Sequence, residues 1–215
     1  MQLMSQENAA NDYKGFEKKN QSRLRQKQLL WKKVAYTGGS SMGASPKTTS
    51  FLKECMADAL LYLMKEKPFA KITVNEIART AGVNRSTWFR NFATKTEALT
   101  YKLVVLWYRW TADHGIAECH RYTVDNADTF FTFNASVRDM LSLIYQAELQ
   151  ACVYDAFYQI MKPQYGDDPV ECYEARFYSY GLFGLLDEWI KRGFYETPEQ
   201  LTALFREVVK DLWPA

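Results

Sequence analysis

The chain has few of the residues from which metal sites and disulfide frameworks are built. Its 215 residues include two histidines and four cysteines. The cysteines have no paired spacing, which is typical of free thiols in a reducing compartment. They are Cys55, Cys119, Cys152 and Cys172. His114 and Glu118 stand one helical turn apart, but a third metal ligand is not evident. We therefore predict no metal site, no cofactor and a cytoplasmic protein.

Long hydrophobic runs are also missing. The uninterrupted runs are short, as from Leu103 to Tyr108, whereas a membrane-spanning helix needs about 20 apolar residues. The N-terminus has no apolar segment of the kind found in secretory signals. The composition is still 47% hydrophobic and 15% aromatic, enough for a sizeable core. We predict one large or two small domains and no membrane partner.

The net charge of +2 conceals an uneven distribution along the chain. Residues 1–46 carry a net charge of +5, residues 47–102 another +5, and residues 103–215 carry −8. A basic N-terminal part joined to an acidic remainder is the electrostatic pattern of a DNA-binding head on a separate body.

Residues 71–98 predict two short helices, a tight turn between them and the start of a third helix. Thr73 and Glu76 have the spacing of a capping box at a helix start. Gly82 suits the left-handed conformation that ends a helix, and Asn84 is a good N-cap for the next one. This is the layout of a helix-turn-helix, whose second helix enters the DNA major groove. A plain helical hairpin would share part of the pattern.

The second of these helices, residues 85–92, is predicted to have two different sides. Trp88 and Phe92 are four apart and share a side suited to burial. The other side and the flanking turns carry groups that can contact bases or phosphates, and Lys95 lies close to the expected path of a phosphate. The predicted DNA-binding residues are Thr73, Asn75, Asn84, Arg85, Ser86, Thr87, Phe89, Arg90, Asn91 and Lys95.

This segment resembles the DNA-binding domain of the tetracycline-repressor (TetR) family of bacterial regulators. The family commonly carries a run like I-T-hydrophobic-x-x-I-A-x-x-A-G-V-S-x-S-T-hydrophobic-Y-x-H-F-x-x-K-x-x-L. The chain matches that run at Ile72, Thr73, Ile77, Ala78, Ala81, Gly82, Val83, Ser86, Thr87, Phe92, Lys95 and Leu99. It departs where Phe89 replaces the usual tyrosine, Asn91 the histidine and Asn84 the serine. The departures bear on the operator sequence and on affinity, not on the fold.

The resemblance implies an all-α, dimeric regulator, acting as a repressor on a near-palindromic double-stranded DNA operator. The predicted domains are a basic N-terminal extension (1–46), a three-helix helix-turn-helix head (47–95) and a helical bundle for effector binding and dimerisation (96–215). The extension has too few apolar groups to offset its ordering entropy, so we predict that it is flexible. There are two alternatives for these residues: they form a basic arm that contacts DNA, or the native protein starts at Met42.

Apolar residues at helical spacing predict helices through the rest of the chain. The expected helices span residues 49–65, 94–122, 125–146, 147–161, 170–192 and 198–213. Residues 170–192 are apolar on more than one side, so that helix needs two partners; one is its own core and the other the same helix of a second subunit. The predicted dimer residues are Tyr180, Gly181, Gly184, Leu185, Trp189, Leu201, Leu204, Phe205 and Val208.

Residues 103–215 hold four Trp, ten Tyr and eight Phe. Such rings build either an ordinary core or a pocket for an aromatic or apolar small-molecule effector. The candidate pocket residues are Trp107, Trp110, Phe130, Phe133, Tyr145, Tyr154, Phe157, Tyr158 and Phe177. The second hypothesis is that the helical bundle binds a protein partner rather than a small molecule. Because no nucleophile–base set is evident, we predict that the chain is not an enzyme.

Overall fold

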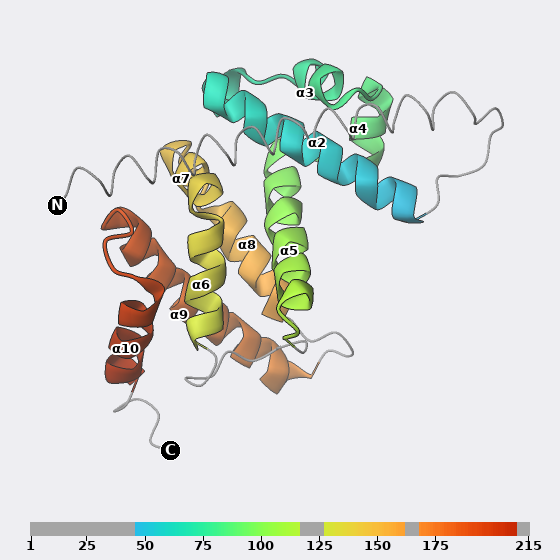
Figure 1. Ribbon diagram of the computed structural model, residues 1–215. Coiled ribbons are helices and arrows are strands. Elements are labelled where there is room, and N and C mark those ends of the chain that lie inside the picture. Colours follow the sequence, from blue (N-terminus) through green and yellow to red (C-terminus); the bar gives the residue numbers. More distant parts are fainter. Residues whose placement is uncertain (1–45, 117–126, 162–167, 210–215) are drawn as a thin grey trace. The chain divides into compact units, whose positions relative to one another are not determined.

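The computed structural model describes residues 46–116, 127–161 and 168–209 (Figure 1). In these ranges the chain forms nine α-helices and one 3-10 turn, with no strand, so the predicted all-α class is confirmed. The elements are α2 (Pro46–Glu66), η1 (Phe69–Lys71), α3 (Val74–Ala81), α4 (Arg85–Asn91), α5 (Lys95–Asp113), α6 (Ala127–Ser136), α7 (Arg138–Gln146), α8 (Ala151–Met161), α9 (Pro169–Lys191) and α10 (Pro198–Val209).

The tertiary contacts separate the chain after Pro46, and the structure described below belongs to the unit Lys47–Ala215. The predicted extension, residues 1–46, therefore lies outside the described residues apart from its last position. Among the helices just named, none combines the length and the apolar character that crossing a bilayer requires.

The first three helices and the start of α5 enclose a compact apolar core. α2 contributes a buried stripe that includes Met56 and Leu60, and α3 contributes Ile77. From α4, Trp88 is buried, and its ring lies 5.2 Å from that of Phe92, centroid to centroid. The predicted shared side of Trp88 and Phe92 is confirmed. Since α4 is anchored through this one side, its other side remains in solvent.

The remaining helices pack as neighbours around a second set of aromatic residues. α5 packs against α8, α8 against α9, and α6 against α10. Phe131 of α6 links the last two helices, because its ring meets Trp189 of α9 at 6.1 Å and Phe205 of α10 at 6.3 Å, both edge-on. Such edge-to-face pairs are the arrangement that aromatic quadrupoles favour.

One predicted helix, residues 125–146, is in fact two. α6 ends at Ser136, and α7 begins after Val137. The side chains at the break bond to the helix backbone: Asn134 Nδ2 donates to the carbonyl of Phe130 at 2.8 Å, and Ser136 Oγ to that of Phe133 at 2.6 Å. Polar side chains of this kind compete with the helical ladder, which the apolar periodicity did not reveal.

Two other predicted helix boundaries were wrong. α8 begins at Ala151 rather than at residue 147, because Glu148 adopts a left-handed conformation with φ 58°. α5 ends at Asp113, and Gly115 follows with φ 65°. The predicted continuation of that helix to residue 122 ends outside the described residues.

A cluster of ion pairs joins α2 to α5. Lys102 of α5 is only 7% exposed, and its Nζ lies 2.6 Å from a carboxylate oxygen of Asp58 and 3.7 Å from one of Glu54. Arg109, about two turns further along α5, donates to both carboxylate oxygens of Glu54 at 2.8–2.9 Å. The helix that follows the helix-turn-helix is thus tied by charge to the helix that precedes it.

Candidate nucleic-acid interface

The turn between α3 and α4 is held by main-chain hydrogen bonds. The predicted capping box at the start of α3 is present, with Thr73 Oγ1 accepting from the N–H of Glu76 and the Glu76 carboxylate accepting from the N–H of Thr73. Gly82 is left-handed, with φ 70°, as predicted. The N–H of Val83 then reaches the carbonyl of Ala78 at 2.9 Å, which closes the helix end in the Schellman manner.

Asn84 precedes α4 as predicted, but its side chain does not cap the helix. The N–H of Thr87 donates instead to the main-chain carbonyl of Asn84 at 2.9 Å. Because that amide already has a partner, the helix start does not need the Asn84 side chain, which is exposed. Asn84 is therefore the N-cap residue of α4, as predicted, but without a side-chain hydrogen bond to the helix.

The exposed side of α4 carries several groups that can hydrogen-bond to DNA. Arg85, Ser86 and Arg90 are exposed. Thr87 is only 8% exposed, and its Oγ1 accepts from Arg90 Nη2 at 3.3 Å. Asn91 is half-buried, and its Nδ2 donates to the carbonyl of Thr87 at 2.7 Å. Arg90 also donates through Nε to the carbonyl of Ser86 at 3.3 Å, so within α4 the freer hydrogen-bonding groups lie at the first turn.

Phe89 is the large apolar residue on this side of α4, and it is 56% exposed. The guanidinium carbon of Arg85 lies 5.2 Å from the centroid of its ring. Arg85 precedes Phe89 by four residues, the spacing that brings two side chains together on one helix face. The geometry is that of a cation–π contact on an exposed surface.

Lys95 points into the head rather than out to solvent. Its Nζ donates to the carbonyls of Phe69 at 2.7 Å and Ile72 at 2.8 Å, and it lies 4.2 Å from the centroid of the Phe69 ring. Burial lowers the pKa of the Lys95 ammonium. These contacts use two of its three N–H donors, so in this arrangement Lys95 holds η1 against the start of α5.

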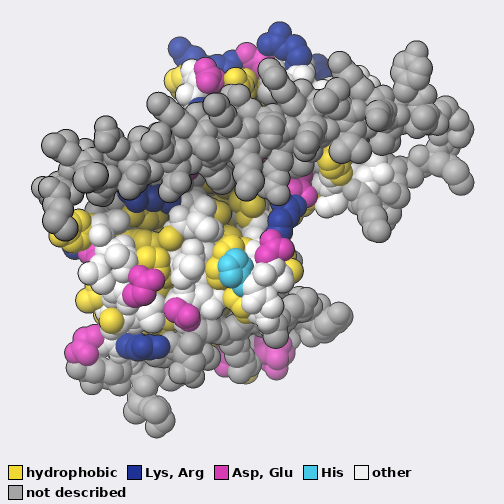
Figure 2. Space-filling model, viewed as in Figure 1, with side chains coloured by type: hydrophobic (Ala, Val, Ile, Leu, Met, Phe, Trp, Pro, Cys, Tyr) yellow, Lys and Arg dark blue, Asp and Glu magenta, His cyan; other side chains and the backbone are white. Residues whose placement is uncertain are grey.

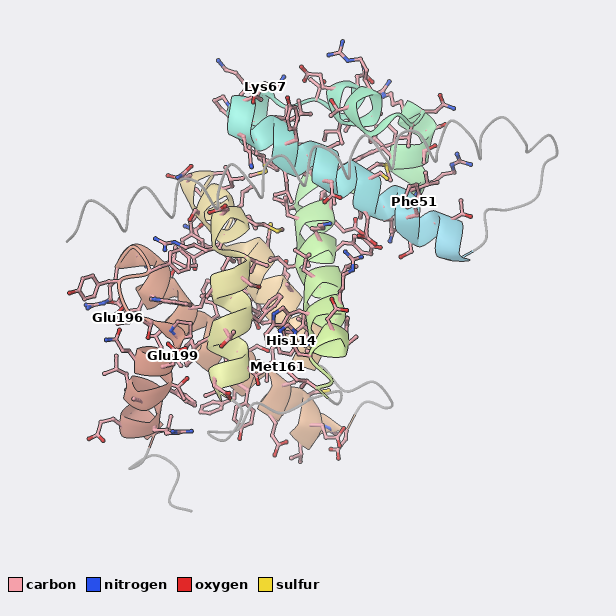
Figure 3. The ribbon with its side chains drawn as sticks, in the orientation of Figure 1. Phe51, Lys67, His114, Met161, Glu196 and Glu199 are labelled. Carbon is pink, nitrogen blue, oxygen red and sulfur yellow. The ribbon has the colours of Figure 1, made fainter. Side chains whose placement is uncertain are left out.

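The start of α3 is also fixed by an ion pair that the sequence patterns did not predict. Lys67, at the end of α2 (Figure 3), donates to the Glu76 carboxylate that closes the capping box. The hydrogen bonds from Lys67 and Thr73 lower the pKa of Glu76 from 4.5 to about 2. Figure 2 shows Lys and Arg side chains gathered over α3 and the end of α2, along the upper edge of the view.

Two further predicted DNA-binding residues lie on α3 or at its start. Thr73 and Asn75 are both exposed. The Thr73 hydroxyl is engaged in the capping box and donates to Glu76 at 2.8 Å. Asn75 therefore offers the freer polar group at this end of α3.

The predicted pocket residues separate into three groups. Trp107, Trp110 and Phe133 form one cluster, with ring centroids 5.0–6.2 Å apart. Phe130 and Phe157 form a second pair at 5.4 Å. The third group lies toward α9, where Tyr154 and Tyr158 meet the guanidinium of Arg176. Tyr145 is half-buried, and Phe177 is 64% exposed on α9, where its ring contacts Tyr178.

The first of these clusters extends to His114 at the end of α5 (Figure 3). The His114 ring stacks on that of Trp110 at 4.0 Å between centroids, and its Nδ1 lies 2.7 Å from the Trp110 carbonyl oxygen. Within the described residues, no group of three or more His, Cys, Asp and Glu side chains is arranged to hold a metal ion. Cys119 and Glu118 lie outside those residues.

Most of the predicted dimer residues are accessible in the single chain. Tyr180, Gly181, Gly184, Leu204 and Val208 are exposed, and Leu185, Leu201 and Phe205 are half-buried. Trp189 differs, because it is 2% exposed and its Nε1 donates to the carbonyl of Glu196 at 3.0 Å. It packs inside the chain, against Phe131 and Phe194.

The sequence patterns missed the buried charge at Lys102. The available signal was a lysine inside an otherwise apolar stretch of α5, together with two acids four residues apart on α2, Glu54 and Asp58. The sequence does not show that the lysine and the two acids pair with one another, because they are more than forty residues apart in the chain.

Comparisons with known proteins agree with this geometry. Residues 57–99 match the family model described as bacterial regulatory proteins, tetR family. Residues 111–211 match a second TetR model, described as transcriptional regulator C-terminal region. Among proteins with curated functions, none matches the chain. The crystal structure of Lin0861 from Listeria innocua is similar in fold, with a TM-score of 0.60 and 11% sequence identity over 81% of this chain and 97% of that one.

Proposed function

Because the chain belongs to the TetR family of DNA-binding transcriptional regulators, we propose that it acts as a repressor that binds a near-palindromic operator as a homodimer. Members of this family regulate transcription and are not enzymes. In the proposed complex, α4 of each subunit lies in the major groove of one half-site. Such half-sites stand about one DNA turn, or a multiple of it, apart. A protein that binds the genome of a bacterium works in the cytoplasm.

The observation that carries the proposal is the exposed side of α4. It presents Arg85, Ser86 and Arg90 to solvent, while the buried Trp88 anchors the helix to the core of the head. The turn at Gly82 is fixed by main-chain bonds, so the helix is held ready for binding. Preorganised donors of this kind lose little conformational entropy when they meet the edges of bases.

Exposed apolar side chains on the last two helices support the homodimer. Of the ten large hydrophobic residues that are exposed in the described residues, six lie on α9 or α10. They are Val170, Tyr173, Phe177, Tyr180, Leu204 and Val208. A Cβ atom added at Gly181 or Gly184 would have no heavy atom of this chain within 4 Å. This leaves room for the close approach of a second helix.

We also propose that an aromatic or apolar small molecule releases the repressor from its operator. The support is the ring cluster of Trp107, Trp110 and Phe133 on α5 and α6, because α5 continues directly from the DNA-binding head. A ligand that favours one position of α5 would change the spacing of the two heads. It must bind the released form more tightly than the DNA-bound form.

Selection of bound fragments from random double-stranded DNA, followed by gel shift, tests the proposed function. The wild-type chain should enrich one near-palindromic sequence, and its affinity should fall steeply with salt because phosphate contacts release counterions. Arg85→Ala should weaken binding of that sequence by about tenfold or more, as the loss of a base contact does. Arg138→Ala, which removes an exposed arginine from α7, is the matched control. Failure of the wild-type chain to enrich any sequence would refute the proposal.

A further inference from the structure

The exposed phenyl ring of Phe89 is not explained by packing within the chain. It is 56% exposed, whereas the neighbouring Trp88 is buried. Every other exposed α4 side chain is polar or charged. A large apolar group kept in water is unfavourable. Its presence on a DNA-facing helix therefore points to an apolar contact that forms only in the complex.

The ring also holds an arginine in place. The guanidinium carbon of Arg85 lies 5.2 Å from the ring centroid. A cation–π contact leaves the N–H groups of a guanidinium able to donate hydrogen bonds to other partners. The pair thus presents two neighbouring chemical surfaces, an apolar ring and a set of hydrogen-bond donors.

The major groove offers a match for each surface. The C5 methyl of thymine is the apolar group that bases display there, and O6 and N7 of guanine accept two hydrogen bonds from one arginine. A phenyl ring cannot hydrogen-bond to a phosphate, so the sugar–phosphate backbone is the poorer partner. Base pairs rise 3.4 Å along each strand, so two groups 5.2 Å apart reach the same or adjacent base pairs.

We propose that Phe89 and Arg85 together read a thymine and a guanine at the same or adjacent base pairs of each operator half-site. The Phe89 ring packs on the thymine methyl, and the Arg85 guanidinium donates to guanine O6 and N7. The inference rests on the proposed operator binding and adds the chemistry of the bases that α4 recognises.

The test begins with the operator that the wild-type chain selects. Each thymine of one half-site is replaced in turn by deoxyuridine, which removes the C5 methyl and keeps the base pair. One such replacement should weaken wild-type binding about fourfold, the factor expected from the loss of one buried methyl-sized group. The same replacement should leave the affinity of the Phe89→Ala variant for the operator unchanged, because that variant has no phenyl ring to contact the thymine methyl.

A matched variant shows that the effect belongs to this ring. Tyr195 is an exposed aromatic residue outside α4, and Tyr195→Ala should respond to deoxyuridine like the wild type. Arg85→Ala should lose its preference for guanine at the same or a neighbouring base pair. Circular dichroism should show all three variants folded, since the altered side chains are exposed.

Two results would overturn the proposal. One is a wild-type operator in which no thymine responds to deoxyuridine, which would place Phe89 against the sugar–phosphate backbone. The other is an equal response in the wild type and in Phe89→Ala. Both outcomes presuppose an operator, and they are therefore distinct from a failure of the proposed function, in which the wild-type chain enriches no DNA.

Discussion

The ammonium group of Lys95 joins two segments of the head that are more than twenty residues apart. It bonds to the carbonyls of Phe69 and Ile72 and covers the Phe69 ring. The motif around Lys95 predicts a phosphate contact, and periodicity cannot reveal that the carbonyls of Phe69 in η1 and of Ile72 just after it lie within reach. The geometry instead indicates that Lys95 positions the loop from which α3 begins.

Replacing Lys95 by methionine separates these two roles. Lys95→Met keeps the length of the side chain but leaves both carbonyls without this donor, so the free energy of unfolding should fall by about 1–3 kcal/mol. Urea denaturation measures the change. Lys71→Met, at an exposed lysine of the same turn, should change stability by less than about 0.5 kcal/mol. If Lys95 served mainly as a phosphate contact, its loss would reduce the salt dependence of DNA binding and spare stability.

Glu76 makes the stability of the head depend on acid pH. Its pKa is lowered from 4.5 to about 2 by hydrogen bonds from Lys67 and Thr73. The folded chain therefore favours the charged carboxylate. The stabilisation is complete above about pH 4.5, where the unfolded chain is also ionised, and is lost as the pH falls toward about 2.

Comparison with Glu76→Gln isolates this contribution. Thermal unfolding should show a wild-type advantage over Glu76→Gln at about pH 6 that becomes smaller at about pH 3. The glutamine variant keeps the size of the side chain and can still accept a hydrogen bond from Thr73, so it removes chiefly the titratable charge. Parallel loss of stability in the two proteins would show that other carboxyl groups govern the acid response.

At the scale of secondary-structure elements, the helix pair α2 and α5 is held by a partly buried charge cluster. Lys102 lies between the carboxylates of Asp58 and Glu54, and Arg109 covers Glu54 from the solvent side. Breaking a buried ion pair is costly because it leaves a charge without compensation. The cluster therefore ties α2 to α5 by charge at two positions along α5.

Lys102→Met should destabilise the chain by about 3 kcal/mol, because it removes the buried ammonium that pairs with the carboxylates of both Asp58 and Glu54. Arg109→Ala is the control, since Arg109 is about half exposed and an exposed pair contributes about 1 kcal/mol or less. Chemical denaturation followed by tryptophan fluorescence measures both. Equal effects of the two changes would mean that the cluster is better solvated than its exposure indicates.

Helix boundaries illustrate how local and tertiary information differ. The capping residues Thr73 and Gly82 act on amides within a few positions of themselves, so the sequence predicts them correctly. The break between α6 and α7 depends on Asn134 and Ser136 bonding to carbonyls inside an apolar helix. In that case the apolar periodicity continues across the break, and only the backbone geometry reveals it.

For the whole molecule, the open side of α9 makes the proposed homodimer testable. Gly184 has no heavy atom of this chain near the position of a Cβ. Gly184→Leu should therefore leave the fold of the single chain intact, and even favour the helix slightly, since glycine is about 1 kcal/mol less favourable there than alanine. It should weaken the dimer and the operator complex, because the larger side chain separates the two helices.

Analytical ultracentrifugation and gel shift measure the two effects of Gly184→Leu. Ala112→Leu adds the same side chain at an exposed position of α5 and should leave association unchanged. A Gly184→Leu protein that associates as the wild type does would exclude Gly184 from the interface. A wild-type chain that stays monomeric at micromolar concentration would refute the homodimer itself.

The family, the all-α class and the two-sided recognition helix follow from the amino-acid sequence, because caps, turn glycines and apolar spacing act between residues a few positions apart. The tertiary structure alone decided where the charges of Lys95 and Lys102 lie and which aromatic rings are neighbours. These contacts join segments that are distant along the chain. Packing set those positions, since a side chain bonds to whatever lies within a few ångströms of it, whatever the separation along the backbone.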